Sequence, residues 1–137
     1  NVLTDTWSTQ YLTRAKYITY NFIDLDQEKL IEQSKLNYLN SLENVSRNEC
    51  HHINVLEGDA SLLQGKRFDV IIANINRNIL MNDLSTYVTC LNEKGVLFLS
   101  GFYDSDCELI ESSCNQLNLK LEKTLTRNSW VALKFVK

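Results

Sequence analysis

The chain contains no proline and only four glycines, Gly58, Gly65, Gly95 and Gly101. Nucleotide-binding enzymes place glycine in their phosphate loops, because it adopts positive φ and lets the backbone approach a ligand closely. None of the four glycines lies in the first 57 residues. The amino-terminal part of the chain therefore carries no ordinary glycine-rich phosphate loop.

Paired metal-binding cysteines, long apolar runs and clusters of basic residues are also lacking. The four cysteines include no CxxC pair, which argues against a metal site. No apolar run approaches the roughly 20 residues of a membrane-spanning helix, and the opening NVLTDTWSTQ does not have the pattern of a signal peptide. The net charge of −3, with scattered positive residues, argues against broad binding to nucleic acid. We expect a cytoplasmic protein with buried, unpaired thiols, Cys107 and Cys114 sharing one helix face.

The 137 residues, 44% of them hydrophobic, are enough for one domain with a substantial core. Strand and helix patterns alternate along most of the chain. Strands are predicted at Val2–Leu3, Ile18–Asp24, Ile53–Leu56, Phe68–Ala73, Val96–Ser100, Leu119–Leu125 and Trp130–Val136, and helices over 9–16, 26–42, 79–92 and 104–117, with 43–52 as a loop and 61–65 as a connector. This alternation predicts an α/β fold with a doubly wound, mostly parallel sheet. The closing pair of strands, joined by TRNS, predicts that an antiparallel last strand joins at one edge.

The stretch FDVIIANINRNIL, residues 68–80, is the most informative. It opens with an apolar, β-branched run that predicts a strand buried on both faces. A corner with three asparagines follows, and then a helical pattern begins with Ile79, Leu80, Leu84, Val88 and Leu91 on one face. Ligand sites lie at the carboxyl ends of strands in such sheets. The corner is therefore either part of a ligand site or a structural turn capped by asparagines.

Polar residues follow three predicted strands: Asp24, Asp59 and Asn74. A carboxylate such as Asp24 can accept both hydroxyls of a ribose, and a polar group after the next strand can reach an adenine edge. The carboxamide of Asn74 can both donate and accept, so it can orient an amine or a carboxylate. The structural alternatives are a helix cap for Asp24 and turns for Asp59 and Asn74. His51 and His52 lie in a polar stretch and are expected to be solvated.

Five segments resemble the catalytic domain of the bacterial ribosomal protein L-eleven methyltransferase family, which belongs to the class I S-adenosylmethionine-dependent methyltransferases. They read NFIDLDQEKLIEQSKLN, VLEGDASLL, FDVIIANINRNIL, GVLFLSGFY and NSWVALKF. The resemblance covers about Asn21 to Lys137. It implies a seven-stranded sheet with the last strand antiparallel. It also implies a single methyltransferase-like domain over residues 1–137, without the family's amino-terminal substrate-recognition domain.

The resemblance implies methyl transfer from S-adenosylmethionine to amines of a ribosomal protein, with no metal and no nucleic-acid partner. Asp24 would bind the ribose, Asp59 would approach the adenine, and Asn74 with the backbone around Ile75 would lie beside the methionine portion and the amine. The family's glycine loop corresponds to Thr6–Gln10, TWSTQ, which makes Thr6 a cofactor-binding candidate.

Two other functions stay open at this point. One is a noncatalytic domain that keeps the fold as a binding or structural module, favoured by Trp7 within the glycine-free loop. The other is amino-group methylation of nucleic acid, for which an Asn-Pro-Pro-aromatic corner is expected. The ANIN corner has neither prolines nor an aromatic residue, and the chain is acidic. The protein methyltransferase is therefore the preferred interpretation.

Overall fold

The computed structural model describes residues 17–20 and 27–137, with side chains from residue 35 onwards. The predicted elements within 1–16, the end of the strand predicted at 18–24 and the cap expected at Asp26 lie outside these residues. The described residues fall into two compact units, which divide between Leu62 and Leu63. No helix in the described part of the chain is long and apolar enough to cross a membrane.

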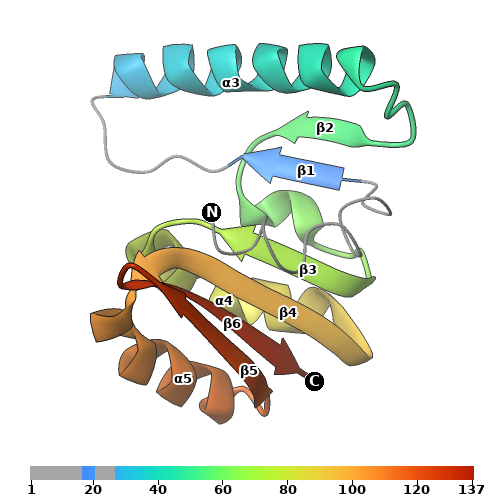
Figure 1. The fold of residues 1–137 in the computed structure, drawn as a ribbon. Helices are drawn as coiled ribbons and strands as arrows, with labels where there is room; N and C mark the ends of the chain where they lie inside the picture. The colour runs from blue at the N-terminus through green and yellow to red at the C-terminus, as the bar shows by residue number, and fades with distance from the viewer. Residues whose placement is uncertain (1–16, 21–26) are drawn as a thin grey trace. The chain divides into compact units, whose positions relative to one another are not determined.

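The unit that ends at Leu62 contains two parallel strands and one long helix (Figure 1). Strand β1, Tyr17–Tyr20, pairs with β2, Asn54–Glu57, in the register Tyr20↔Glu57. Helix α3, Gln27–Arg47, connects the two strands. A parallel pair joined by a helix is the βαβ unit that the sequence predicts.

Helix α3 extends further than predicted, because residues 43–47 of the expected loop are helical. Neither glycine nor proline interrupts ENVSR, and Glu43 forms an ion pair with Arg47 one turn later at 2.6 Å. The helix ends at Arg47. Two residues later Glu49 has a φ of 54°, in the left-handed region, and the Cys50 N–H donates back to Val45 O. Polar composition alone was therefore a poor guide to where this helix ends.

The unit from Leu63 onwards contains a four-stranded sheet in the order β3-β4-β6-β5. Its strands are β3 (Phe68–Asn74), β4 (Leu91–Tyr103), β5 (Lys120–Arg127) and β6 (Trp130–Val136). β3 and β4 are parallel, and β6 is antiparallel to both of its neighbours. The α/β class, with mostly parallel strands and an antiparallel last strand, is confirmed. The predicted edge position of that strand is wrong, because β6 lies between β4 and β5.

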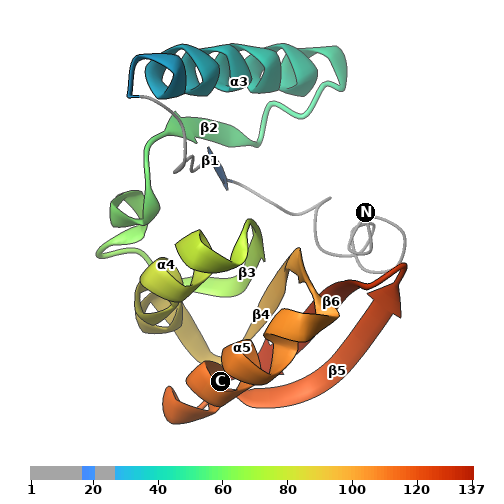
Figure 2. The same cartoon turned by 90° about the vertical axis from the view of Figure 1, so that its left-hand side faces the viewer.

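Two helices of this unit lie on the same face of its sheet, since they contact each other (Figure 2). They are α4, Arg77–Cys90, and α5, Cys107–Gln116. The predicted apolar face of α4 is confirmed by the burial of Ile79, Leu80, Leu84, Val88 and Leu91. On α5, Ile110 and Cys114 are fully buried. Cys107 is only half-buried, contrary to prediction, because α5 begins at this residue.

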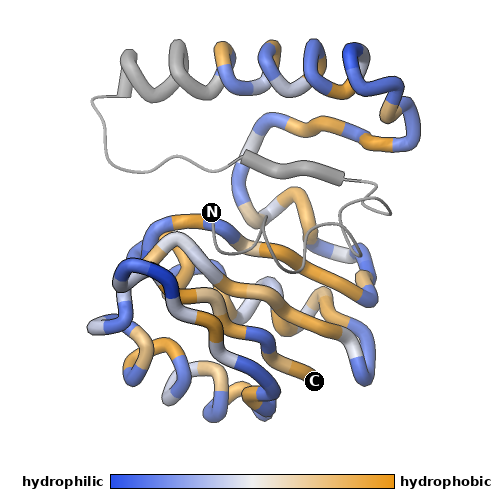
Figure 3. Tube along the Cα trace, in the orientation of Figure 1, coloured by the Kyte–Doolittle hydropathy of each residue, from blue (hydrophilic) through white to orange (hydrophobic). Residues whose placement is uncertain are grey.

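The strands buried on both faces are β4 and β6 rather than β3. Consecutive residues Leu97, Phe98 and Leu99 are all buried, whereas β3 alternates, with Ile71 and Ala73 buried and Ile72 half-buried. The hydropathy of β3 in Figure 3 is uniformly apolar at its centre. Within its four-stranded sheet, however, β3 has a neighbour on one side only. An apolar run thus identified a strand, but it did not identify the most buried one.

Two further boundaries differ from prediction. Helix α4 ends at Cys90, and β4 begins at Leu91, before Gly95. At the other end of β4, Asp104 does not cap the next helix. Its Oδ1 accepts from the Ser105 N–H at 2.8 Å, and residues 104–106 form one 3₁₀ turn, η3, before α5 starts.

The connector predicted at 61–65 is likewise a 3₁₀ turn, η2, Ala60–Leu63. The TRNS hairpin is confirmed: Asn128 and Ser129 both have positive φ between paired Arg127 and Trp130.

Basic side chains hold the carboxyl end of α4. Lys137 Nζ donates to Val88 O at 3.0 Å and to Leu91 O at 2.9 Å. Arg67 Nη1 donates to Thr89 O at 2.6 Å. Positive charge at a helix carboxyl end is favourable, because the last carbonyl groups lack partners within the helix.

We expect Lys137→Met to lower the free energy of unfolding by about 1–2 kcal/mol, since it removes two charge-assisted hydrogen bonds and keeps most of the aliphatic stem. Chemical denaturation measures this change. Lys120→Met is the matched control, because Lys120 is an exposed lysine of β5 and should change stability by less than about 0.5 kcal/mol. Equal losses in the two variants would contradict the capping role of Lys137.

Candidate functional site

The three asparagines in the corner between β3 and α4 have different roles. Asn76 caps α4, since its Oδ1 accepts from the Ile79 N–H at 3.1 Å. The Oδ1 of Asn78 accepts from Arg77 Nε and Nη2. Asn74 caps no helix: its Oδ1 accepts from Ser100 Oγ at 2.7 Å, while the residue is exposed. Capping therefore explains Asn76 and leaves Asn74 as the asparagine able to meet a ligand.

The corner is built against the end of β4. Asn74 and Ser100 are register partners in the parallel pair, and the Ile75 N–H donates to Ser100 O at 2.9 Å. Both strands run in the same direction, so their carboxyl ends lie at one edge of the sheet, as expected for a ligand site. Ser100 is the polar last residue of the strand predicted at Val96–Ser100, the same signal that identified Asn74, but it was not predicted as a site residue.

Gly101 allows the backbones of β4 and the corner to approach each other closely. Its φ is 99°, and an added Cβ would lie 2.4 Å from the backbone oxygen of Ile75. The pairing of β4 with β6 shifts register between Ser100 and Phe102, which makes Gly101 a bulge residue. Only glycine combines this φ with so close an approach of two backbones. The sequence shows that Gly101 is one of only four glycines, but residue spacing does not predict that it lies against Ile75.

Charged and aromatic side chains lie around the carboxyl end of β4. Arg77 Nη1 contacts Asp106 Oδ1 at 2.9 Å, which links the start of α4 to η3. Tyr103 and Trp130 are register partners with ring centroids 4.4 Å apart, and both are more than 40% exposed. The carboxyl edge of this unit therefore presents a polar corner and an exposed aromatic pair.

Asp59 lies in the other unit, two residues after β2, and is exposed. Its Oδ1 accepts from the Ser61 N–H at 2.8 Å, and its backbone oxygen accepts from the Leu62 N–H. Hydrogen bonds from the Ser61 side chain, and then from its backbone, lower the pKa of the Asp59 carboxyl. Asp59 is therefore a turn residue that also presents an ionised carboxylate at neutral pH. Asp24 and Thr6 lie outside the described residues.

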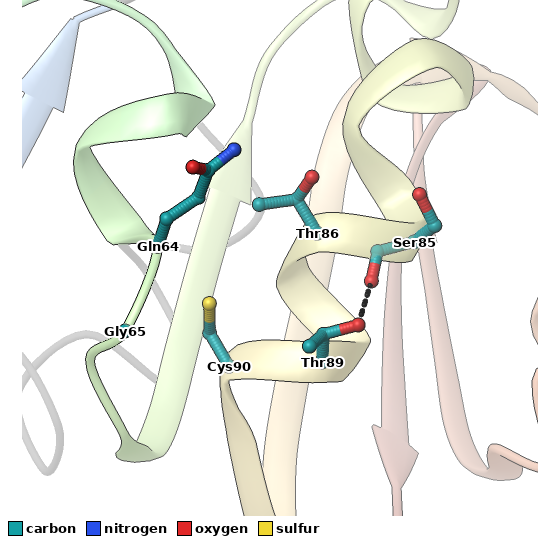
Figure 4. Close-up of a pocket in the computed structure, with 6 residues that line it drawn as sticks. All are labelled: Gln64, Gly65, Ser85, Thr86, Thr89 and Cys90. Atoms are coloured by element: carbon teal, nitrogen blue, oxygen red, sulfur yellow. Dashed lines mark hydrogen bonds between the residues drawn. The ribbon is translucent and has the colours of Figure 1, made fainter.

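A shallow cavity of about 220 Å³ lies against the carboxyl-terminal half of α4 (Figure 4), whereas Asn74 precedes the amino end of this helix. It is lined by Gln64, Gly65, Ser85, Thr86, Thr89 and Cys90. The Thr89 hydroxyl donates to Ser85 O at 2.8 Å, and the Cys90 thiol donates to Leu63 O. Since it adjoins the amino end of β3, this cavity is not the candidate site.

The histidines and cysteines form no metal centre among the described residues. His51 and His52 are exposed, as expected. All four cysteines are free, with Cys90 and Cys114 buried. Burial, followed by the charge of Glu111, raises the pKa of the Cys114 thiol to about 12. Burial, followed by Glu111, Asp104 and Asp106, also raises the pKa of Cys107.

The rates of thiol labelling should follow the burial and the pKa of each cysteine. At pH 8 we expect half-buried Cys50 to react first with a disulfide reagent and Cys114 last, because the thiolate is the reactive form and Cys114 stays protonated and inaccessible. Raising the pH from 8 to 10 should accelerate Cys107, whose raised pKa delays its ionisation. Peptide mapping by mass spectrometry measures each rate, and denatured protein supplies the control. Labelling of Cys114 as fast as that of Cys50 would contradict the packing of α5.

Solved structures define the class. The fold resembles a ribosomal protein L11 methylase from Lactobacillus delbrueckii subsp. bulgaricus, with a TM-score of 0.67 and 20% identity over 89% of this chain and 57% of that chain. A methyltransferase from Pyrococcus furiosus gives a TM-score of 0.62 and 17% identity over 95% of this chain and 66% of that chain. Together with the polar corner at the carboxyl end of β3, these likenesses define a class I methyltransferase fold.

Sequence comparisons give the family. Residues 31–137 match the family described as ribosomal protein L11 methyltransferase (PrmA). A protein of that description from Bacteroides fragilis is 48% identical over 71% of this chain and 35% of its own length. One from Staphylococcus aureus is 26% identical over 85% of this chain and 38% of its own length. The chain belongs to the ribosomal protein L11 methyltransferase family, and it spans about a third of the length of these relatives.

Proposed function

We propose that this chain is the catalytic part of an S-adenosylmethionine-dependent methyltransferase that modifies amines of ribosomal protein L11 in the cytoplasm. The observation that carries the proposal is the exposed Asn74 carboxamide, which has no capping role at the carboxyl end of β3. Membership of the methyltransferase family supports methyl transfer as the reaction at this corner.

The proposed roles at the corner follow from hydrogen-bonding capacity. The Nδ2 hydrogens of Asn74 would donate to the carboxylate of the cofactor's methionine portion. The second lone pair of Oδ1, beside the one used by Ser100, would accept an N–H of the substrate amine. A neutral carboxamide suits this position, because it orients the amine without holding a proton on it.

Three other residues are proposed to hold the cofactor. Asp24 would accept the ribose hydroxyls and Asp59 would approach the adenine, while Thr6 would lie in the loop beside the cofactor. The exposed, ionised carboxylate of Asp59 is compatible with a ligand role, although its Oδ1 is partly engaged by Ser61. A carboxylate and a carboxamide together have the hydrogen-bonding capacity to hold a nucleoside linked to an amino acid.

Bound S-adenosylmethionine would supply a methyl group on a positively charged sulfur. Attack by the amine nitrogen on this methyl group would break the carbon–sulfur bond, leave its electron pair on sulfur and release one proton from the nitrogen. The protein must then hold the amine in line and unprotonated. This role requires positioning rather than a nucleophilic side chain, and Asn74 with the Ile75 backbone supplies it.

A noncatalytic binding module is the second candidate, because Thr6–Gln10 carries Trp7 and no glycine. The two functions differ in a transfer assay with radiolabelled S-adenosylmethionine and purified ribosomal protein L11. We expect label in L11 and none in a second, lysine-rich ribosomal protein supplied as control. Cofactor binding without label in L11 would favour the binding module and contradict the catalytic proposal.

A further inference from the structure

We propose that Ser100 is a positioning residue that fixes which end of the Asn74 carboxamide faces the substrate amine. The inference rests on the proposed function of Asn74. It concerns the orientation of that side chain, which can be measured whether or not the chain transfers a methyl group.

The contact joins a buried hydroxyl to an exposed side chain. Ser100 is 2% exposed and lies directly opposite Asn74 in the β3–β4 register. Its Oγ is 2.7 Å from Asn74 Oδ1. Its backbone oxygen also accepts from the Ile75 N–H. Ser100 thus holds the corner twice, once through the main chain and once through its side chain.

A hydroxyl can distinguish the two ends of a carboxamide. The single hydrogen of Ser100 can be donated to the oxygen of Asn74 but not to its nitrogen, which is itself a donor. If the carboxamide turned over, the hydroxyl hydrogen would need another acceptor. Among the described residues, Asn74 is the only hydrogen-bond partner of Ser100 Oγ. A buried hydroxyl without an acceptor is unfavourable, so the observed orientation is strongly preferred.

This orientation determines which side of the Asn74 carboxamide binds a donor and which side binds an acceptor. With Oδ1 accepting from Ser100, one lone pair of this oxygen remains for an incoming N–H, and the Nδ2 hydrogens are left to donate to an acceptor. An acceptor such as a carboxylate is therefore bound on the nitrogen side, and a donor such as a neutral amine on the oxygen side. Reversal of the carboxamide would place a donor against the amine and an acceptor against the carboxylate.

The direct test is the mobility of the Asn74 side-chain amide, measured by ¹⁵N relaxation in the full chain. We expect an order parameter of about 0.8 in the wild type and below about 0.6 in Ser100→Ala. Ser41→Ala is the matched control, because Ser41 is also buried and its hydroxyl donates to Asn37 O at 2.8 Å, far along the chain. An unchanged order parameter in Ser100→Ala, or an equal fall in Ser41→Ala, would overturn the inference.

A double-mutant cycle then separates positioning from stability. Ser100→Ala should lower the rate of methyl transfer about tenfold in the wild type but less than about twofold in Asn74→Ala, because the hydroxyl acts through Asn74. Ser100→Thr, which keeps the hydroxyl, should restore the amide order. Equal losses in both backgrounds would show that Ser100 supports the fold only. If the wild type transfers no methyl group, the proposed function fails, and the order parameters still decide the role of Ser100.

Discussion

Asn74→Ala should lower the rate of methyl transfer by about 100-fold or more, because it removes both the donor to the cofactor and the acceptor for the amine. The residue is exposed and caps no helix, so the fold should persist. Single-turnover transfer of labelled methyl to ribosomal protein L11 measures the loss. Circular dichroism shows whether the variant is folded.

Two further variants test whether this loss is specific to the Asn74 carboxamide. Asn78→Ala removes an exposed asparagine from the same corner and should retain nearly full activity, because among the described residues its side chain hydrogen-bonds only to the neighbouring Arg77. Asn74→Asp keeps an acceptor for Ser100 but replaces the Nδ2 donor with negative charge, so it should be as inactive as Asn74→Ala. Equal activity in Asn74→Ala and Asn78→Ala would show that Asn74 is only part of a turn.

Gly101→Ala should be the most destabilising single methyl addition in the described part of the carboxyl-terminal unit. A Cβ at this position lies 2.4 Å from Ile75 O, which is backbone and cannot rotate away, and the φ of 99° is itself unfavourable for alanine. We expect a loss of about 3 kcal/mol or more, which corresponds to a fall in melting temperature of about 10 °C. Scanning calorimetry measures both quantities.

Gly65→Ala isolates the steric part of that effect. Gly65 also has positive φ, 75°, but an added Cβ would meet nothing within 4 Å. Only the conformational cost of about 1 kcal/mol then remains. Because Gly101 adjoins Ser100 and faces Ile75, its substitution should also displace the corner and reduce methyl transfer, whereas Gly65→Ala should not. Similar losses of stability in the two variants would contradict the close approach at Gly101.

Local patterns were enough to find the framework of the site. The apolar run before Asn74 identified β3, and the spacing from Ile79 to Leu91 identified the buried face of α4. Strand-to-helix corners in parallel sheets are local in sequence, so Asn74 could be singled out before any contact was known.

Contacts between distant segments were not predictable in the same way. Ser100 and Gly101 lie beside the corner because β4 pairs with β3, although α4 and part of β4 separate them from the corner in sequence. The position of β6 between β4 and β5 is also set by pairing rather than by the strand's own residues. The end of α3 was misplaced for a different reason, because residues 43–47, which are mostly polar and exposed, continue the helix.

Calorimetric titration of the full chain with S-adenosylmethionine tests the central claim most directly. The account predicts saturable binding, weakened at least tenfold in Asp24→Ala, which loses the proposed contact to the ribose hydroxyls. Asp26→Ala provides a neighbouring carboxylate as control and should bind as the wild type does. Absence of binding at millimolar cofactor would contradict the account, whatever the integrity of the Asn74 corner.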